Sequence, residues 1–564
     1  MEAFFTALYA LDGVLGTILR YILPLLAGWI LFRCGRSLLT FRREPEIWAW
    51  LSMPNGDRLP VTHWENTIGR AKSCDISVQY QTISRQHAVL TRYDDGSWTV
   101  TDTRSKGGVC VDGQPVSCSE VRYGQIISLA GVEFTLMPIN KEQELAQAGY
   151  RARAGERVRP WVTLLLLTVF QFILTLSLLS GTETWMTLLP SMGALMAMEW
   201  LLFAFYALIR RSAFELETMA LLLCSVSLGV IAVSQPTALL KQTVCILLGI
   251  LVFLGVGWCL RDQDRARRVR YFAAVAGVVL LLCAVVFGTT VNGAKNWIYI
   301  SGLSIQPSEL AKICFVFVGA STMERLLAKR NLVLFLIYTG VICILLAILS
   351  DFGTALVFFV AFLVIAFLRS GDFATLSLIC AGTGFAGLLA VRFLPYIKNR
   401  FAAWGHVWEH ALTTGYQQTR AMMCVAAGGL FGLGAGHGWL HFVAASDTDL
   451  VFAFVSEEYG LLMALLLTAV PILMAAFVVR SAPQGRSSFY TIGACAAVSI
   501  FLTQTVLNVF GTVDLLPLTG VTFPFLSRGG SGMIAAWGLL AFLKSADTRQ
   551  NASFTIRLPG REPA

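Results

Sequence analysis

Long apolar segments dominate this chain and restrict the folds open to it. A run of about 20 apolar residues crosses the hydrocarbon layer of a membrane as a helix. Such segments fall at about 13–32, 161–180, 185–208, 214–233, 238–259, 271–290, 308–326, 331–349, 353–369, 373–393, 451–479, 488–509 and 530–543. Only 14% of the residues are charged and 56% are hydrophobic, whereas soluble domains carry about a quarter charged residues. The sequence therefore predicts a polytopic α-helical membrane protein with about thirteen transmembrane helices.

The basic residues lie in short clusters between these segments. Cytoplasmic loops are enriched in Lys and Arg, so the clusters place the N-terminus outside and the C-terminus inside. This pattern accounts for the net charge of +9 without a nucleic-acid-binding patch. The 13 cysteines lie mostly singly in apolar segments, without metal-ligand spacing. They are interpreted as small buried hydrophobic residues rather than as a disulfide framework or zinc site.

Residues 46–138 differ in kind from the rest of the chain. Short runs of alternating polarity are separated by turn signals such as Asp112-Gly113, and none reaches membrane length. We therefore predict a soluble all-β sandwich inserted on the cytoplasmic side. A basic linker follows at 139–160.

Three motifs in this region resemble those of forkhead-associated (FHA) domains: Ile68-Gly69-Arg70, Ser84-Arg85-Gln86-His87 and Asp102-Thr103-Arg104-Ser105. The resemblance implies binding of phosphothreonine peptides through loops at one end of the sandwich. Arg70 and Ser84, with Arg85 beside them, match the residues that hold the phosphate, and such charge-assisted contacts suit a phosphate dianion. Gly69 and His87 match structural positions.

One part of the FHA pattern is absent. Where the family has Asn-Gly-Thr, this chain has Gly107-Gly108-Val109, so it lacks the Asn that normally holds the peptide backbone. The alternative is therefore an FHA fold retained as a docking module that does not read phosphate.

The stretch from Gly415 to Gly460 is a predicted outer loop that leads into a membrane-length segment. It is rich in glycine, contains the polar cluster Ser446-Asp447-Thr448-Asp449, and carries two more carboxylates, Glu457 and Glu458. Carboxylates close to hydrocarbon usually face protein, water or substrate. By residue type alone, a flexible outer loop with a charged helix cap explains the stretch equally well.

The same stretch resembles the long outer loop of the SEDS family of FtsW, RodA and SpoVE. The shared motifs are GYQ, AGGLFGLGAG and TDLVFAFVSEEYG. The resemblance implies a peptidoglycan glycosyltransferase that polymerises lipid II at the outer face of the bacterial cytoplasmic membrane, and Asp449 matches the essential aspartate of the family. A class B penicillin-binding protein transpeptidase is the partner implied.

Further SEDS-like motifs supply candidate substrate-binding residues. Glu309 and Lys312 are spaced to pair on one helix face, and a cation there suits a lipid-linked pyrophosphate. Asp351 matches a family aspartate but could equally cap the segment at 353–369. Arg528 stands where the family usually has an aromatic residue. The full set of candidates is Trp297, Gln306, Glu309, Lys312, Asp351, Arg400, Gln417, Arg420, Ser527 and Arg528.

The chain is therefore predicted to have six parts. They are an N-terminal anchor at 1–45, the FHA domain at 46–138, the linker at 139–160, an additional helix pair at 161–212, a ten-helix SEDS core at 213–545 and a cytoplasmic tail at 546–564.

Polymerising lipid II requires a base for a sugar hydroxyl and positive charge for the departing pyrophosphate. Asp449 is the predicted base, and Mg²⁺ or Mn²⁺ could assist the leaving group. Two alternatives stay open: a lipid II flippase, which would also need intramembrane charges, and a non-catalytic scaffold that recruits partners through the FHA domain. The sequence does not distinguish division, elongation and sporulation.

Overall fold

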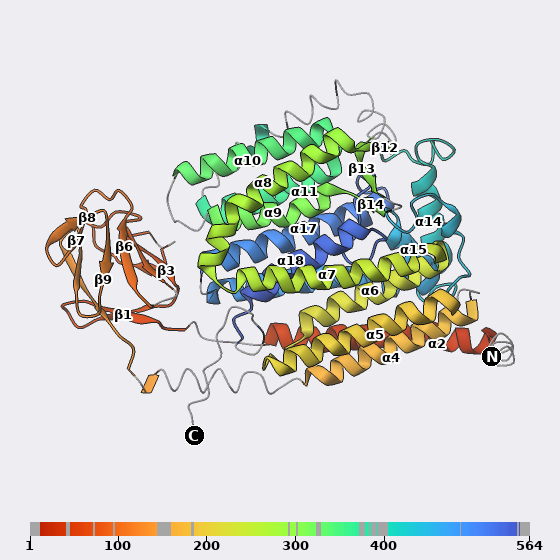
Figure 1. The fold of residues 1–564 in the computed structure, drawn as a ribbon, viewed down its shortest axis with the longest axis horizontal. Coiled ribbons are helices and arrows are strands. Elements are labelled where there is room, and N and C mark those ends of the chain that lie inside the picture. The colour runs from red at the N-terminus through yellow and green to blue at the C-terminus, as the bar shows by residue number, and fades with distance from the viewer. Residues whose placement is uncertain are drawn as a thin grey trace.

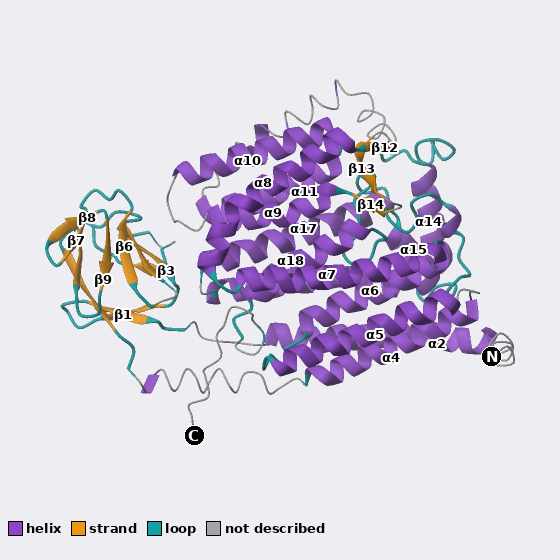
Figure 2. Ribbon diagram, viewed as in Figure 1, coloured by secondary structure: helices purple, strands orange, loops and turns teal. Residues whose placement is uncertain are grey.

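The computed structural model shows a β-rich part at one end of a bundle of helices (Figure 1, Figure 2). The residues it describes are 12–40, 46–71, 74–93, 96–140, 142–143, 159–181, 185–211, 213–291, 294–300, 303–322, 329–370, 377, 379–382, 384, 392, 404–485, 487–549 and 552. Most of the predicted segment 373–393 and of the predicted linker and tail lies outside these residues.

The β-rich part is a sandwich of two sheets, as the sequence predicts. One sheet has the order β2-β1-β11-β10-β7-β8 and the other the order β4-β3-β5-β6-β9. The strands are β1 (Ala49–Ser52), β2 (Arg58–Val61), β3 (Glu65–Gly69), β4 (Ile76–Ser77), β5 (Ala88–Arg92), β6 (Trp98–Asp102), β7 (Val109–Val111), β8 (Gln114–Val116), β9 (Cys118–Val121), β10 (Ile126–Leu129) and β11 (Val132–Met137).

Alternation explains how these strands bury a common core. In β6, Trp98 and Val100 are buried while the residues after each are half-exposed, which is the period of a strand with one buried face. Asp112 and Gly113 join β7 to β8 with φ values of 49° and 82°. Two positive φ angles are characteristic of the tight hairpin turn that such a pair favours, so the turn predicted there is confirmed.

The helical part has the following elements. They are α2 (Asp12–Thr40), α4 (Pro160–Gly181), α5 (Trp185–Leu208), α6 (Glu215–Ser234), η1 (Pro236–Ala238), α7 (Leu239–Leu260), α8 (Gln263–Phe287), α9 (Pro307–Thr322), α10 (Lys329–Ile348), α11 (Phe352–Ser370), α14 (Tyr416–Gly428), η2 (Leu440–Phe442), α15 (Val451–Tyr459), α16 (Leu461–Ser481), η3 (Ala482–Gln484), α17 (Ser488–Thr512) and α18 (Gly530–Ala546).

Within the described ranges, eight helices are long and apolar enough to cross a membrane, namely α2, α4 to α8, α16 and α17. Helices α10 and α11 carry shorter apolar stretches, and the total of thirteen remains a prediction. Of the residues in the most apolar stretch of helix α6, 94% are buried. They are buried because α2, α4 and α5 pack on this helix together with α7, α16 and α18. The additional helices thus cover the first helix of the predicted core.

Three sequence-based expectations need correction. The first apolar segment, predicted at 13–32, belongs to a helix that continues through Arg33 and Arg36 to Thr40. The segment predicted at 451–479 is two helices, α15 and α16, separated at Gly460. Gly460 has a φ of 92°, and a Cβ there would lie 2.3 Å from the Leu430 carbonyl oxygen, so backbone packing ends the first helix.

The third correction concerns the connection before α9, which the sequence analysis left without regular structure. It forms a small antiparallel sheet of β12 (Thr289–Val291), β13 (Ala294–Ile300) and β14 (Leu303–Ile305). This sheet and α14 lie at the end of the bundle opposite the sandwich (Figure 1). The assignment of these two ends to the two sides of a membrane stays a prediction.

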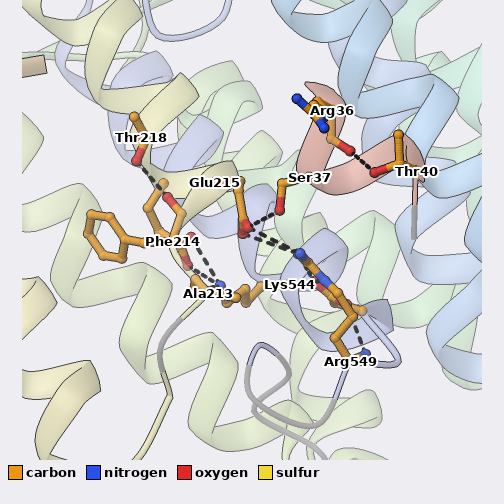
Figure 3. A network of polar contacts seen from close by, with 11 residues as sticks. Arg36, Ser37, Thr40, Ala213, Phe214, Glu215, Thr218, Lys544 and Arg549 are labelled. Carbon is orange, nitrogen blue, oxygen red and sulfur yellow. Dashed lines mark hydrogen bonds and ion pairs between the residues drawn. The ribbon is translucent and has the colours of Figure 1, made fainter. Parts of the chain in front are cut away.

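A buried polar network joins α2 to the core at the sandwich end of the bundle. Figure 3 shows Ser37 of α2 and Arg549, just beyond α18, both directed at Glu215 of α6. The Ser37 hydroxyl donates to Glu215 at 2.5 Å, and Arg549 contacts both Glu215 oxygens at 3.2 Å. Lys544 pairs with Glu217 at 2.9 Å. The first residues of the predicted tail are therefore packed into the bundle.

The sandwich also touches the connection between α16 and α17. The Ser488 hydroxyl donates to the Glu65 carboxylate at 2.5 Å, and His63 Nε2 lies 3.2 Å from the Pro483 carbonyl oxygen. Glu65 begins β3 and Gly69 ends it. The sandwich therefore meets the helices through the end of β3 opposite the predicted phosphopeptide loops.

Candidate functional site

Asp449 lies in a tight turn between η2 and α15. The backbone amides of Thr448, Asp449 and Leu450 all donate to the carbonyl oxygen of Ala445, at 3.2, 2.9 and 3.3 Å. Ala445 has a φ of 61°, which an L-residue adopts only when its surroundings impose it. The turn carries Asp447, Thr448 and Asp449 to the N-terminus of α15.

Three consecutive carbonyl groups of this turn are each fixed by another part of the chain. The carbonyl oxygens of Asp447, Thr448 and Asp449 accept, in order, from the Arg528 amide (2.8 Å), the Ser527 hydroxyl (2.6 Å) and Asn508 Nδ2 (3.0 Å). Asn508 belongs to α17, and the other two belong to the segment before α18. Since two distant segments hold the backbone on both sides of Asp449, its position is set by tertiary structure rather than by a flexible loop. The alternative of a flexible outer loop does not fit this turn.

The Asp449 side chain is half-buried and faces Gly520. A Cβ added to Gly520 would lie 3.4 Å from Asp449 Oδ2. Gly520 also has a φ of 71°, a conformation that favours glycine. Gly520 therefore brings the backbone of the segment before α18 against the Asp449 side chain.

Arg528 and Asp447 form an ion pair beside this turn. Arg528 Nε lies 2.6 Å from Asp447 Oδ2, and Arg528 Nη2 lies 3.3 Å from Oδ1. The Ser234 hydroxyl of α6 also donates to Asp447 Oδ2, at 3.1 Å. Arg528, for which the sequence analysis identified no partner, is therefore held by a carboxylate 81 positions away in the chain.

Glu309 and Lys312 form the pair that their spacing predicts. Lys312 Nζ lies 2.6 Å from Glu309 Oε1, and the Lys312 side chain is 1% exposed. Both residues line a cavity together with Thr522 and Ser527. The cavity has a volume of about 10 Å³, which is close to the minimum for one water molecule. A sugar-linked pyrophosphate does not fit this cavity, so a direct contact with Lys312 requires the site to open.

Asp351 serves as the N-cap of α11, one of the two roles considered for it. Its Oδ1 accepts the Thr354 amide at 3.1 Å, which is the contact of a capping carboxylate. Its Oδ2 accepts from Gln306 Nε2 at 3.1 Å and from Asn296 Nδ2 at 3.0 Å. Asp351 is buried, and its contact with Asn296 of β13 ties α11 to the small sheet. Trp297 lies in that sheet, where its carbonyl oxygen accepts from Thr289 Oγ1 at 3.0 Å.

Gln417 and Arg420 lie on α14. Gln417 Nε2 donates to the carbonyl oxygen of Ala444, at 2.9 Å, one residue before the turn that carries Asp449. The Arg420 guanidinium lies over the Tyr416 ring at 5.3 Å. Arg400 lies outside the described residues. Gln417 thus contacts the residue that precedes the turn carrying Asp449, whereas Arg420 contacts its own helix.

Glu457 and Glu458 bind the backbone of the glycine-rich loop rather than the site. Glu457 accepts the amides of Trp439 and Leu440 at 2.8 and 2.9 Å. Glu458 accepts the amides of Gly436 and Gly438. Carboxylates that accept several backbone N–H groups can be buried without a cation. Their task is to fold the loop against α15.

The predicted phosphopeptide residues converge at one end of the sandwich. The Arg70 amide donates to the Ser84 carbonyl oxygen at 3.0 Å, and the Ala71 amide to that of Arg85 at 2.9 Å. The Ser84 hydroxyl accepts the Lys106 amide at 3.1 Å. Both arginine side chains are exposed. The structure therefore leaves two cations at the loops that the resemblance assigns to phosphate.

Gly69 and His87 support these loops. A Cβ on Gly69 would lie 2.4 Å from the Arg85 carbonyl oxygen, so only glycine allows the two loops to approach this closely. His87 is fully buried; its Nδ1 accepts the Ser84 amide at 3.1 Å, and its Nε2 therefore donates to the Gly108 carbonyl oxygen at 2.9 Å. These two contacts place the ring proton of His87 on Nε2.

Gly107 occupies the place of the missing asparagine. A Cβ there would lie 2.3 Å from the Ala130 Cβ. This backbone therefore has no room for an Asn side chain at position 107.

The described part of the chain contains no group of three or more His, Cys, Asp or Glu side chains that could hold a metal ion. These described residues therefore do not fit a resident metal centre. Sequence reasoning missed Asp447 and Ser234 as partners of the site. The nearest signals in the sequence were Arg528, a cation where the family usually has an aromatic residue, and Asp447, an aspartate two positions before Asp449.

Comparisons with known proteins match both parts of the chain to families. The model of the FtsW, RodA and SpoVE family, described as cell cycle proteins, matches residues 206–552, and the FHA domain model matches residues 66–130. Peptidoglycan glycosyltransferase RodA of Mycobacterium tuberculosis is 31% identical over 332 residues, which are 54% of this chain and 69% of the relative. The probable peptidoglycan glycosyltransferase FtsW of Coxiella burnetii is 32% identical over 270 residues, 46% and 72% of the two chains.

One solved structure shares the fold of the helical part. It belongs to a study of polymerization and crosslinking by a peptidoglycan synthase complex. The match has a TM-score of 0.50 and 24% identity, and covers 59% of this chain and 96% of that chain.

Proposed function

The chain belongs to the FtsW, RodA and SpoVE family and carries an FHA domain, and from this premise we propose that it is a peptidoglycan glycosyltransferase that polymerises lipid II. The observation that carries the proposal is the turn at Asp449, whose backbone is held on both sides and whose motif matches that of the family's essential aspartate. Relatives at 31% and 32% identity bear the name peptidoglycan glycosyltransferase. Because hydrogen bonds hold the backbone on both sides of Asp449, the turn can present the carboxylate to a substrate in a defined position.

In the proposed reaction, the 4-hydroxyl of an acceptor N-acetylglucosamine attacks C1 of a donor N-acetylmuramic acid. The new C1–O bond forms as the bond from C1 to the pyrophosphate oxygen breaks, and undecaprenyl pyrophosphate leaves. Asp449 takes the hydroxyl proton. A positioned general base contributes about 100- to 10,000-fold to such a step. The lipid already carries its leaving group, so no nucleotide takes part.

Cations near the outer end of the bundle are proposed to meet the pyrophosphate. Candidates on the described residues are Arg420 and Lys312, and Arg400 belongs with them by sequence. Lys312 is paired with Glu309 in this structure, so it either releases that carboxylate when substrate binds or acts by keeping Glu309 neutralised within the bundle. The exchange Lys312→Arg separates these roles, since it keeps the charge and alters the geometry.

The FHA domain is proposed to be a cytoplasmic regulatory module that binds a phosphothreonine protein. Exposed Arg70 and Arg85 support phosphate binding, whereas the packing of Ala130 against Gly107 supports weak recognition of the peptide backbone. We therefore expect modest affinity that depends more on phosphate than on the flanking sequence. A class B penicillin-binding protein transpeptidase is the proposed partner of the membrane core, on the outer side.

The test is polymerisation of purified lipid II by the reconstituted protein. Wild type is expected to make glycan strands, and Asp449→Ala to make none while remaining folded in the membrane. Strands of normal length from purified Asp449→Ala would end the catalytic proposal. A wild-type protein that moves lipid II across the bilayer without polymerising it would favour the flippase, and one that does neither would favour the scaffold.

A further inference from the structure

The ion pair between Arg528 and Asp447 joins the two segments that surround Asp449. The contact has three parts: two from the guanidinium to the carboxylate, at 2.6 and 3.3 Å, and one from the Arg528 amide to the Asp447 carbonyl oxygen, at 2.8 Å. One residue is thus bound to the other through both side chain and backbone. The geometry suits arginine because its planar donors match a carboxylate.

Burial makes this pair hard to open. The Asp447 side chain is 4% exposed and that of Arg528 is 32% exposed. A carboxylate buried to that degree needs a cation and hydrogen-bond donors, and Asp447 obtains them from Arg528 and from Ser234 of α6. The turn therefore cannot shift at Asp447 without leaving a buried charge unpaired.

Asp447 transmits this constraint to Asp449 over two residues. The next two carbonyl groups of the turn are held by Ser527 and Asn508, and Ser527 directly precedes Arg528 in the chain. Movement of Arg528 would therefore displace two of the three anchors of the turn together. The third anchor, Asn508, also donates to the Val521 carbonyl oxygen at 3.0 Å, which ties α17 to the segment that carries Arg528.

An alternative task for Arg528 is direct binding of the pyrophosphate. Its partly exposed guanidinium would suit that task if its charge were available. However, Nε and Nη2 are directed at Asp447, and the carboxylate offsets the positive charge. The geometry favours orientation of the turn over anion binding.

We propose that Arg528 is a positioning residue that acts through Asp447 to orient Asp449. The proposal rests on the proposed function, since Asp449 is the residue to be oriented. Losing either member of the pair displaces the base from its substrate without removing a substrate contact. The expected effect is on kcat rather than on KM.

The test is a double-mutant cycle on lipid II polymerisation, with Arg528→Ala, Asp447→Ala and both together. Each single change is expected to lower kcat by about tenfold or more with little change in KM, and the double change to cost hardly more than one of them. Arg528→Lys should recover only part of kcat, because lysine cannot make the forked contact. Arg480→Ala, an exposed arginine in the last turn of α16, is the matched control and should retain wild-type kcat.

Two results would overturn the proposal. If Arg528 binds the pyrophosphate, Arg528→Ala raises KM while Asp447→Ala, which frees the cation, leaves kcat intact. Additive effects of the two changes would equally show that the residues act separately.

Hydrogen exchange at the amides of residues 446–450 gives a readout that needs no turnover. Faster exchange is expected in both single variants and not in Arg480→Ala; unchanged exchange in both would contradict the proposal. If wild type fails to polymerise lipid II, the proposed function fails, while the exchange measurement still decides whether the pair holds the turn.

Discussion

Removing Arg549 should release the end of the chain from the bundle and weaken the joint between α2 and the core. Arg549 is buried and contacts Asp547 at 2.6 Å and both oxygens of Glu215 at 3.2 Å. Burial alone would lower the pKa of its guanidinium, but the charges of Asp547 and Glu215 outweigh burial and raise that pKa. Arg549→Ala leaves two buried carboxylates without their cation, a loss of about 3–5 kcal/mol for a broken buried pair.

Hydrogen exchange at the amides of residues 545–549 measures this loss directly, because local opening free energies set the exchange rates. A loss of about 3–5 kcal/mol corresponds to exchange at least about 100-fold faster. Arg549→Lys should fall between wild type and Arg549→Ala, since lysine keeps the charge but makes fewer hydrogen bonds. Arg480→Ala is the control for loss of an exposed arginine. Wild-type exchange in Arg549→Ala would refute the reasoning, because it would mean that the network contributes nothing to holding the tail.

Other predictions address the site and the sandwich. Lys312→Ala should lower polymerisation because it leaves Glu309 unpaired in the bundle; unchanged activity and expression would contradict both roles considered for Lys312. Gly520→Ala should destabilise the protein by about 1–2 kcal/mol, because of its left-handed backbone; a melting temperature equal to that of wild type would count against this. Deleting residues 46–138, with the spacing of the flanking helices preserved, should leave polymerisation measurable, and its complete loss in a folded protein would show that the sandwich is part of the catalytic unit. The isolated domain should bind a phosphothreonine peptide more tightly than its unphosphorylated form; if Arg70→Ala changes neither affinity, the domain is a docking fold.

The sequence predicted the architecture well where local patterns determine it. The β-sandwich follows from alternation and from turn signals such as Asp112-Gly113, and the transmembrane segments follow from length and apolar content. It failed where tertiary packing decides. The break at Gly460 depends on backbone contact with Leu430, which lies 30 residues earlier, and the glycine alone does not show that the apolar segment is divided there.

The site was predicted in part, for a similar reason. Asp449 and the Glu309–Lys312 pair follow from a motif and from helical spacing, both of which are local. The anchors of the turn lie on α6, α17 and the segment before α18, and a single sequence does not show which of its polar residues meet across such distances. Asp447 was visible only as part of a polar cluster, although its charge complements that of Arg528.

The central claim is that the Asp449 carboxylate takes a proton during polymerisation of lipid II. The most direct measurement compares single-turnover rates of wild type and Asp449→Asn in the same lipid vesicles. Asn preserves the size of the side chain and cannot act as the base, so the account predicts a rate lower by about 100-fold or more, with unchanged hydrogen exchange at residues 446–450. A rate equal to that of wild type, with the turn intact, would contradict the account.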